Sequence, residues 1–281
     1  MELIKTRKEL QYVLNSDRNR ALSIGLVPTM GALHKGHLSL VDRAVRENDR
    51  VVVSIFVNPT QFNDTNDLKN YPRTIEADAE LLSLYPAVYI FSPDVSEVYP
   101  EPDTRRFDFG PLETVMEGRY RPGHFNGVAQ VVSKLFEIIK PDRAYFGLKD
   151  FQQYSIIKNL VAMLGLPVEI VPCDIVREAD GLAMSSRNAL LSKEHRAVTP
   201  QIYRILQEAV IEAGIYAPDE VKRRVIEKIN SNALLKVEYF EIVDELTLQA
   251  IAGWDQKGKK VGCIAVYAGS VRLIDNIVFD K

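Results

Sequence analysis

Apolar positions in the first part of the chain follow two alternating patterns. Short, nearly continuous apolar runs rich in β-branched residues are typical of buried strands, and they occur at 21–29, 50–57, 87–92, 143–146 and 168–176. Between these runs, apolar residues recur every three or four positions and predict helices at 36–47, 74–84, 128–139 and 150–164. Strands that alternate with helices favour a parallel sheet with right-handed crossovers, so we expect a doubly wound α/β fold.

The pattern changes after about residue 186. Helical periodicity dominates at 194–213 and 218–231, and strand patterns follow at 237–243, 262–268 and 271–274. We therefore expect two domains. A Rossmann-like domain with a doubly wound parallel sheet spans residues 1–180 and binds nucleotide and substrate, and a smaller C-terminal α+β domain spans residues 187–281 and acts as a lid.

Composition and charge limit the class of protein. A net charge of −3 and an isoelectric point near 5.9 argue against binding to nucleic acid through its phosphates. Cys173 and Cys263 lie far apart and form no CxxC motif, which fits a reducing compartment and excludes a cysteine-rich zinc site. The first residues, MELIKTRKEL, lack a secretory pattern, and no apolar run approaches 18 residues. We expect a cytoplasmic protein without membrane partners.

Two polar segments follow predicted strands, and ligands of open α/β sheets bind at the carboxyl ends of strands. The first segment, 28–37, reads PTMGALHKGH, and the second, 58–73, reads NPTQFNDTNDLKNYPR. The second is long for a connection in a compact α/β unit, so it is a candidate binding loop or lid. We expect the chemistry of the protein to lie at these two segments.

The segment PTMGALHKGH places two histidines at the start of a predicted helix. His34 and His37 lie one helical turn apart, so they can face the same ligand, and Gly31 and Gly36 permit close approach of the backbone. A helix N-terminus attracts phosphate, and two imidazoles beside it could stabilise charge at the α-phosphate of a triphosphate. The alternatives are a purely structural histidine pair, or a zinc site completed by His124 or carboxylates.

Several motifs carry a resemblance to a known family. HKGH resembles the HxGH signature of the nucleotidylyltransferase superfamily, and MSSR at 184–187, within READGLAMSSRNALLS, resembles its second signature. The motifs PTMGALHKGH, VNPTQF, YPRT, RPGHF, PDRAYFG, KDFQQ and READGLAMSSRN together resemble the pantoate–β-alanine ligase family, the pantothenate synthetases. The resemblance covers nearly all of residues 20–195, whereas the C-terminal third carries no comparable motif.

The resemblance implies a ligase that makes pantothenate, a precursor of coenzyme A. The carboxylate of pantoate would attack the α-phosphate of ATP to give pantoyl adenylate and pyrophosphate. The amine of β-alanine would then attack the adenylate and release AMP. The resemblance also implies Mg²⁺ as the cofactor of ATP, and a homodimer.

The resemblance further implies the residues of an ATP site. They form three groups along the chain: Met30, Gly31, Ala32, Leu33, His34, Lys35, Gly36 and His37; Gly147, Leu148, Lys149 and Asp150; and Val176, Met184, Ser185, Ser186 and Arg187. The catalytic residues among them would be His37, His34 and Lys149. Lys149 would pair with phosphate, and Asp150 would accept from the ribose hydroxyls. The family usually has Glu where Leu148 stands, so we expect no essential role for this side chain. Ser185 to Arg187 also fit a helix cap.

Pantoate and metal sites are implied in the same way. Gln61 and Gln153 would bind pantoate, and Gln61 would also bind β-alanine, because an amide can both donate and accept hydrogen bonds. Asp78 would bind Mg²⁺, although relatives can carry a second Asp where this chain has Ala77.

Two other functions are compatible with parts of the pattern. Nicotinate-mononucleotide and phosphopantetheine adenylyltransferases share the HxGH signature, but they transfer AMP to a phosphate and need basic residues where this chain has Gln61 and Gln153. A nucleotide sensor without catalysis would be expected to lose His37, Lys149 or the MSSR segment, and all of these are present.

Overall fold

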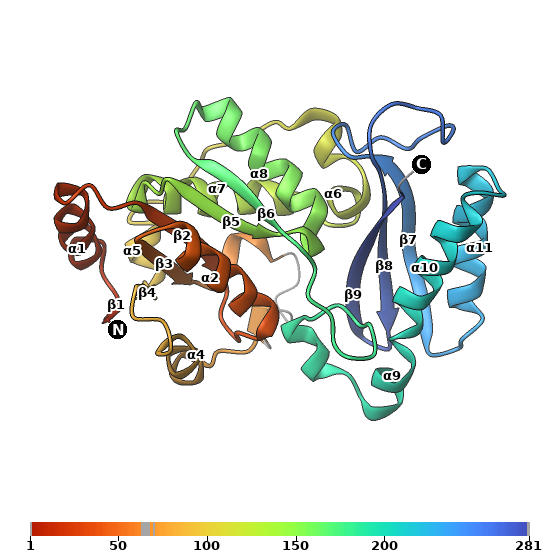
Figure 1. Ribbon diagram of the computed structural model, residues 1–281, viewed down its shortest axis with the longest axis horizontal. Helices are drawn as coiled ribbons and strands as arrows, with labels where there is room; N and C mark the ends of the chain where they lie inside the picture. Colours follow the sequence, from red (N-terminus) through yellow and green to blue (C-terminus); the bar gives the residue numbers. More distant parts are fainter. Residues whose placement is uncertain (1, 63–67, 70, 280–281) are drawn as a thin grey trace. The chain divides into compact units, whose positions relative to one another are not determined.

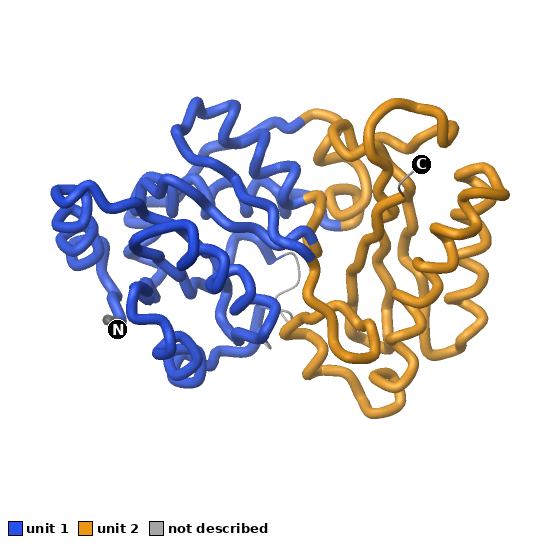
Figure 2. The backbone as a smooth tube through the Cα atoms, viewed as in Figure 1, with its two compact units in different colours: residues 1–109, 121–148, 153–174 blue, residues 110–120, 149–152, 175–281 orange. Residues whose placement is uncertain are grey.

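The computed structural model describes residues 2–62, 68–69 and 71–279, and the chain divides into two compact units (Figure 2). The first unit comprises residues 1–109, 121–148 and 153–174. The second comprises residues 110–120, 149–152 and 175–281. Two short segments that precede residue 175, 110–120 and 149–152, therefore group with the C-terminal residues.

Six strands in the described part of the first unit form one parallel sheet (Figure 1). Their order across the sheet is β1-β4-β3-β2-β5-β6. The strands are β1 (Glu2–Ile4), β2 (Ile24–Thr29), β3 (Arg50–Ile55), β4 (Val88–Phe91), β5 (Arg143–Gly147) and β6 (Glu169–Cys173). The α-helices in the described part of the unit are α1 (Arg7–Asn19), α2 (Lys35–Glu47), α4 (Ile75–Leu82), α5 (Val95–Val98), α7 (His124–Ile139) and most of α8 (Phe151–Leu164). The doubly wound α/β fold is confirmed.

Burial explains why the apolar runs predicted the central strands. Val51 and Val53 of β3 and Val27 of β2 are fully buried in a core cluster that includes Val41 and Ala44 of α2. A strand covered in this way needs apolar residues at nearly every position. Strand β6 lies at the edge of the sheet, where Pro172, which lacks an N–H for the ladder, is tolerated.

The strand order fixes where the loops meet. From β2 the sheet continues through β3 to β4 on one side and through β5 to β6 on the other. This reversal is a topological switch point, and ligands of doubly wound sheets bind outside the carboxyl ends of the strands there. The segments that follow Thr29 in β2, Ile55 in β3 and Gly147 in β5 all leave the sheet at this edge.

Several element boundaries differ from the sequence prediction. Helix α7 begins at His124 rather than 128, because the polar HFNG start of the helix interrupts the apolar period. The helical pattern over 194–213 is two helices, α9 (Lys193–Val198) and α10 (Gln201–Glu212), separated at Thr199 and Pro200. Proline has no N–H for a helical hydrogen bond, so it separates the two helices.

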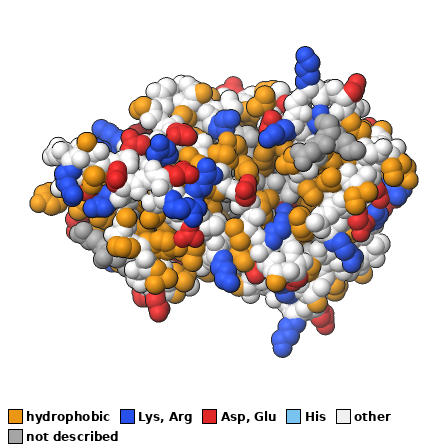
Figure 3. All heavy atoms as spheres, in the orientation of Figure 1, with side chains coloured by type: hydrophobic (Ala, Val, Ile, Leu, Met, Phe, Trp, Pro, Cys, Tyr) orange, Lys and Arg blue, Asp and Glu red, His pale blue; other side chains and the backbone are white. Residues whose placement is uncertain are grey.

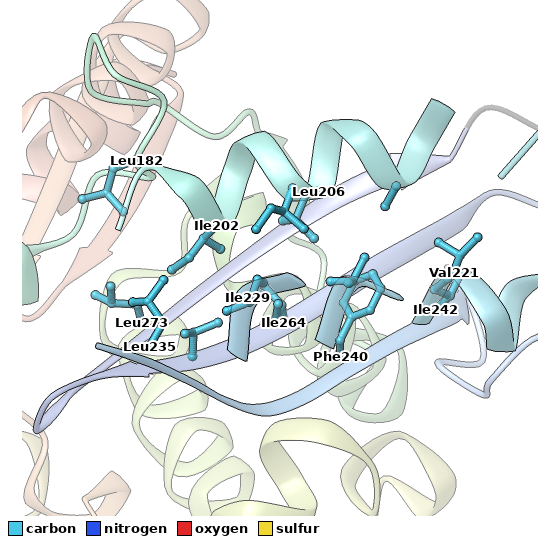
Figure 4. Close-up of a cluster of buried hydrophobic side chains, with 14 of the residues drawn as sticks. Leu182, Ile202, Leu206, Val221, Ile229, Leu235, Phe240, Ile242, Ile264 and Leu273 are labelled. Atoms are coloured by element: carbon cyan, nitrogen blue, oxygen red, sulfur yellow. The ribbon is translucent and has the colours of Figure 1, made fainter. Parts of the chain in front are cut away.

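Three strands in the described part of the second unit form an antiparallel sheet in the order β7-β8-β9. They are β7 (Leu235–Asp244), β8 (Lys260–Ala268) and β9 (Val271–Phe279). Helices α10 and α11 (Pro218–Asn230) contribute Leu206 and Ile229 to one core cluster, which also contains Phe240 of β7 and Ile264 of β8 (Figure 4). The predicted α+β arrangement of the C-terminal region is confirmed.

Surface features agree with the low net charge. Basic and acidic side chains are interspersed on the face shown in Figure 3. None of the helices in the described residues combines the length and the apolar character needed to cross a membrane.

A buried ion-pair network anchors the segment 110–120 within the second unit. Glu117 of α6 (Met116–Tyr120) accepts hydrogen bonds from Arg272 at 2.7 and 2.8 Å and from the Tyr239 hydroxyl at 2.7 Å. Arg272 also donates to Glu238 at 2.5 and 2.9 Å. Burial, together with the charge of Glu117, raises the pKa of Tyr239 well above its ordinary value. One guanidinium is therefore shared by two carboxylates, and this joins α6 to β7 and β9.

We predict that Arg272→Leu destabilises the second unit strongly. The substitution leaves Glu117 and Glu238 without their shared cation, and removing one partner of a buried ion pair costs about 3–5 kcal/mol. Arg223→Leu is the matched control, because Arg223 also bridges two carboxylates, Glu220 and Glu227, but its side chain is 56% exposed. Denaturant unfolding should show a large loss for Arg272→Leu and little change for Arg223→Leu. Equal losses of unfolding free energy in the two variants would contradict the view that burial makes the Arg272 ion pairs important for stability.

Candidate active site

A tight turn connects β2 to the histidine helix. Gly31 and Ala32 both have left-handed backbone conformations, with φ of 83° and 50°. The Thr29 hydroxyl accepts a hydrogen bond from the Gly31 N–H at 3.2 Å and donates to the Ser54 carbonyl of β3 at 2.8 Å. The turn is thereby attached to both strands from which the site is built.

His34 and His37 cap helix α2. The Nδ1 atom of His34, the N-cap residue, accepts from the Gly36 N–H at 3.1 Å, and Nδ1 of His37 accepts from the His34 N–H at 3.3 Å. The centroids of the two rings lie 4.0 Å apart. Because Nδ1 is the acceptor in both rings, their hydrogen bonds assign the proton of each neutral imidazole to Nε2. The structural role of the pair is therefore real, and it directs an N–H donor of each ring away from the helix.

The Asp78 carboxylate lies against the same turn. The residue belongs to α4 and is only 1% exposed. Its Oδ2 accepts from the Ala32 N–H at 2.9 Å, and its Oδ1 accepts from the Leu33 N–H at 2.8 Å and from the Thr74 hydroxyl at 3.2 Å. The described residues contain no group of three His, Cys, Asp or Glu side chains that could hold a metal ion. Mg²⁺ needs only one or two carboxylates besides phosphate and water, so the role of Asp78 as its ligand stays a prediction, although both of its oxygens already accept hydrogen bonds from the protein.

Gln61 lies beside the histidine turn. It ends η1 (Pro59–Gln61), a short 3₁₀ helix after β3, and its Nε2 is 2.8 Å from Sδ of Met30. Asn58, which is 1% exposed, accepts from the Thr60 N–H at 3.3 Å and donates to the Gly127 carbonyl at 3.1 Å. Asn58 therefore fixes the start of this loop against α7.

His124 also positions Gln61, and the sequence analysis gave it only a possible role in zinc binding. Its Nδ1 lies 2.9 Å from the Gln61 carbonyl, and its Nε2 lies 3.1 Å from the Arg121 guanidinium. A Cβ on Gly127, one turn further along α7, would lie 2.5 Å from the Thr60 carbonyl. The glycine thus permits close packing of α7 on η1. The RPGHF motif was the available signal, since it pairs an arginine with a histidine at the start of a helix.

The second unit contains most of the remaining predicted nucleotide residues, beginning with Lys149. Asn276 of β9 donates to the Lys149 carbonyl at 3.1 Å, and Lys149 Nζ is 3.2 Å from Asp150 Oδ2. The preceding residues, Gly147 and Leu148, belong to the first unit. No described atom lies within 4 Å of the position that a Cβ on Gly147 would take, so its backbone can be approached closely.

Hydrogen bonds and an ion pair within the second unit fix the loop that contains the MSSR segment. The Met184 N–H donates to the Val176 carbonyl at 3.0 Å, which joins two parts of the predicted adenine site. Arg177 makes a bidentate ion pair with Asp275 of β9 at 2.7 and 2.9 Å. The Ser185 hydroxyl accepts from the Arg187 N–H at 3.3 Å and caps η4 (Ser186–Leu190), so the alternative of a helix cap is confirmed.

Asp275 and Asn276 are functional candidates that the sequence analysis missed. Both are 6% exposed, and they anchor the loop at Arg177 and the segment at Lys149 respectively. Two adjacent polar residues within the apolar strand VRLIDNIVF were the signal that could have identified them.

Two further predictions concern Gln153 and the loop 58–73. Gln153 lies half-buried in α8, within the first unit. The proposed lid loop 58–73 includes residues 63–67 and 70, which lie outside the described residues, so its closure stays a prediction.

The parallel sheet and the histidine turn at its switch point define an α/β protein of the nucleotide-binding class. The family model of pantoate–beta-alanine ligase matches residues 2–278. The pantothenate synthetases of Phocaeicola vulgatus and Porphyromonas gingivalis strain W83 are 57% and 56% identical to the chain. The alignments cover 99% of both chains in the first case and 100% in the second.

Solved structures give the same result. A pantothenate synthetase from Thermus thermophilus is 43% identical, with a TM-score of 0.91 over 99% of each chain. A pantoate–beta-alanine ligase from Francisella tularensis, complexed with beta-gamma ATP and beta-alanine, is 35% identical. Its TM-score is 0.84, over 100% of this chain and 98% of that one. The chain therefore belongs to the pantoate–beta-alanine ligase family.

Two substitutions of His37 should separate its structural role from its catalytic role. In His37→Asn, Oδ1 can replace Nδ1 as the acceptor for the His34 N–H, but nothing replaces Nε2. In His37→Gln, the amide N–H can reach the position of Nε2, but the acceptor at Nδ1 is lost. We expect His37→Asn to keep its thermal stability and to form pantothenate about 10²–10³-fold more slowly, the range for loss of one preorganised donor.

His37→Gln should show the reverse order, with lower stability and a smaller loss of rate. Steady-state kinetics and thermal unfolding of both variants measure the two effects. Full activity of His37→Asn would show that the histidine only caps the helix.

Proposed function

We propose that the protein condenses pantoate with β-alanine at the expense of ATP, by way of a pantoyl adenylate, and releases AMP and pyrophosphate. The observation that carries this proposal is the family match over residues 2–278. The position of Gln61 beside the histidine turn supports it. The relative from Francisella tularensis, complexed with beta-gamma ATP and beta-alanine, supports the assignment of both as substrates. The chemistry is consistent, since a carboxylate is a poor acyl donor until adenylation gives it a good leaving group.

The histidine turn would bind the phosphates of ATP. His34 and His37 would donate from Nε2 to oxygens of the α-phosphate, where negative charge develops during attack. Their hydrogen bonds at Nδ1 favour this neutral donor form, so we propose charge stabilisation rather than proton donation by His37. Residues Met30 to His37 would line the ATP site, with the helix N-terminus facing the phosphates.

The other predicted nucleotide residues would act from their own segments. Gly147 and Leu148 would approach the ribose through the backbone, Asp150 would accept from its hydroxyls, and Lys149 would exchange Asp150 for a phosphate oxygen. Val176 and the MSSR segment, residues 184–187, would close over adenine and phosphates, with Arg187 supplying a fork of donors.

Pantoate would be held by the amides of Gln61 and Gln153, and Gln61 would later contact β-alanine. A neutral amide can orient the attacking carboxylate without the strong electrostatic stabilisation that a close arginine would give it. The ground state of the nucleophile is then less stabilised, which leaves more of its reactivity for the attack.

The Mg²⁺ that accompanies ATP would be held mainly by phosphate oxygens and water, because both oxygens of Asp78 already accept hydrogen bonds from the protein. When bound, the ion would neutralise charge on the triphosphate.

We also propose that residues 1–180 carry the nucleotide and pantoate sites and that residues 187–281 form a lid. We further propose that the protein is a cytoplasmic homodimer.

Isotope exchange tests the proposed function. If pantoate is adenylated before β-alanine enters, labelled pyrophosphate should exchange into ATP when pantoate is present and β-alanine is absent. Omission of pantoate is the control and should abolish the exchange. A requirement for β-alanine would rule out the separate adenylate, and exchange driven by a mononucleotide instead of pantoate would favour an adenylyltransferase.

Substitutions of Gln61 test the pantoate site. We expect Gln61→Ala to raise the KM for pantoate about 5- to 150-fold, the range for leaving one buried hydrogen-bond partner without the other. Gln61→Glu should raise it further, because two carboxylates would repel each other. ATP binding, measured by calorimetry, should stay unchanged in both variants. Normal pantoate affinity in Gln61→Glu would remove Gln61 from the acid site.

A further inference from the structure

The backbone of the histidine turn forms an anion-binding concavity. Gly31 and Ala32 have consecutive left-handed conformations, with φ of 83° and 50°. Successive N–H groups in such a turn point toward one side and can bind an anion. Here the N–H groups of Ala32 and Leu33 both point toward the Asp78 carboxylate, at 2.9 and 2.8 Å. The protein therefore supplies its own anion for these two donors.

The fit between Asp78 and the turn is close. A Cβ on Gly31 would lie 3.0 Å from Oδ2 of Asp78 and 3.1 Å from Ile55 of β3, so the turn is packed between the carboxylate and the sheet. Thr74, at the N-cap of α4, donates its hydroxyl to Oδ1 of the same carboxylate. Asp78 is 1% exposed, and both of its oxygens are occupied by donors of the protein.

We propose that Asp78 is a positioning residue that fixes the histidine turn for ATP and does not ligate the metal. This proposal rests on the proposed function of the turn. By occupying the N–H groups of Ala32 and Leu33, the carboxylate sets the direction in which the chain enters helix α2, and hence the direction of His34 and His37. Its negative charge also keeps the phosphates of ATP away from these N–H groups and directs them to the imidazoles and the helix N-terminus.

A positioning role and a metal-binding role predict different kinetics. If Asp78 only fixes the turn, its loss lowers the population of the binding-competent conformation, and the apparent affinity for ATP falls by the same factor. Saturating ATP then restores the rate. If Asp78 ligated Mg²⁺, its loss would raise the Mg²⁺ requirement, and additional Mg²⁺ would compensate.

Asp78→Asn is the critical variant because it keeps the shape of the side chain. An amide has only one acceptor oxygen, so its NH₂ group must face the N–H of either Ala32 or Leu33. We expect the KM for ATP to rise about 10- to 100-fold, the order expected when a buried donor loses its acceptor. The kcat at saturating ATP should stay within a few-fold of wild type, and the ratio of variant to wild-type KM should be the same at every Mg²⁺ concentration.

Two further variants complete the experiment. Gly31→Ala strains the same turn without changing the carboxylate, so it should also raise the KM for ATP without changing the Mg²⁺ requirement. Glu76→Gln is the control, because Glu76 is an exposed acid in the first turn of the same helix, and it should match wild type.

The results separate this proposal from the proposed function. Absence of pantoate-dependent pyrophosphate exchange in the wild-type protein would refute the function. With exchange present, an unchanged KM for ATP in Asp78→Asn or in Gly31→Ala would overturn the positioning role. A defect in Asp78→Asn that Mg²⁺ corrects would overturn it in favour of metal binding. A fall in kcat at constant KM for ATP in Asp78→Asn would indicate loss of folded protein. That result would also overturn the positioning role.

Discussion

Backbone groups that leave the carboxyl edge of the parallel sheet lose their partners in the sheet, and side chains near the candidate site replace those partners. Asp78 accepts from the turn after β2, His34 accepts from the first turn of α2, and Asn58 accepts from the loop after β3. In the second unit, Asn276 donates to the carbonyl of Lys149. Buried or half-buried backbone polar groups need such partners. The loops consequently have defined conformations, and a defined loop can hold a catalytic side chain in a fixed direction.

This constraint explains how the histidine pair would combine its observed capping role with the proposed role at the phosphates. Each ring uses Nδ1 to satisfy a backbone N–H of the helix start. That hydrogen bond selects the tautomer with the proton on Nε2 and fixes the orientation of the ring. A serine or asparagine would also cap the helix, but serine has no second polar atom, and Nδ2 of asparagine does not reach as far from the backbone as Nε2 of an imidazole. The imidazole is therefore suited to a helix start that must also stabilise a phosphate.

The sequence predicted the elements and residues whose signals are local. The strands β2 and β3 are buried on both faces, so apolar side chains occupy nearly every position and the pattern is clear. The HKGH turn was also visible, because the histidines are three positions apart. The sequence did not reveal His124, whose contact with Gln61 spans 63 positions, or Asn276, whose contact with Lys149 spans 127. These partners are close only in the folded chain, so a local signal such as RPGHF, or two polar residues within an apolar strand, marks the residue but does not identify its partner.

Asp78 shows the same limit more sharply. Its position shortly after YPRT and the resemblance to the family suggested a metal ligand, and an acidic residue near a triphosphate site makes that interpretation reasonable. In the structure, the oxygens of Asp78 accept hydrogen bonds from the N–H groups of Ala32 and Leu33. From the sequence the two roles look alike, since both require a carboxylate at this point of the chain. They differ in burial and in the number of donors around the oxygens, which depend on how α4 packs beside the turn.

The polar groups near the turn suggest how the site can accept two anions at once. Pantoate and ATP are both negatively charged, and their reacting atoms must approach each other. Neutral donors, the imidazoles and the amide of Gln61, orient oxygen atoms with little change in net charge. Lys149 carries a full positive charge, and Asp150 lies 3.2 Å away as its partner. A strongly cationic site would bind both substrates more tightly but would stabilise the carboxylate before its attack. Preorganised neutral donors at the α-phosphate, as proposed for the imidazoles, would instead stabilise the charge that develops in the transition state, which is where binding energy increases the rate.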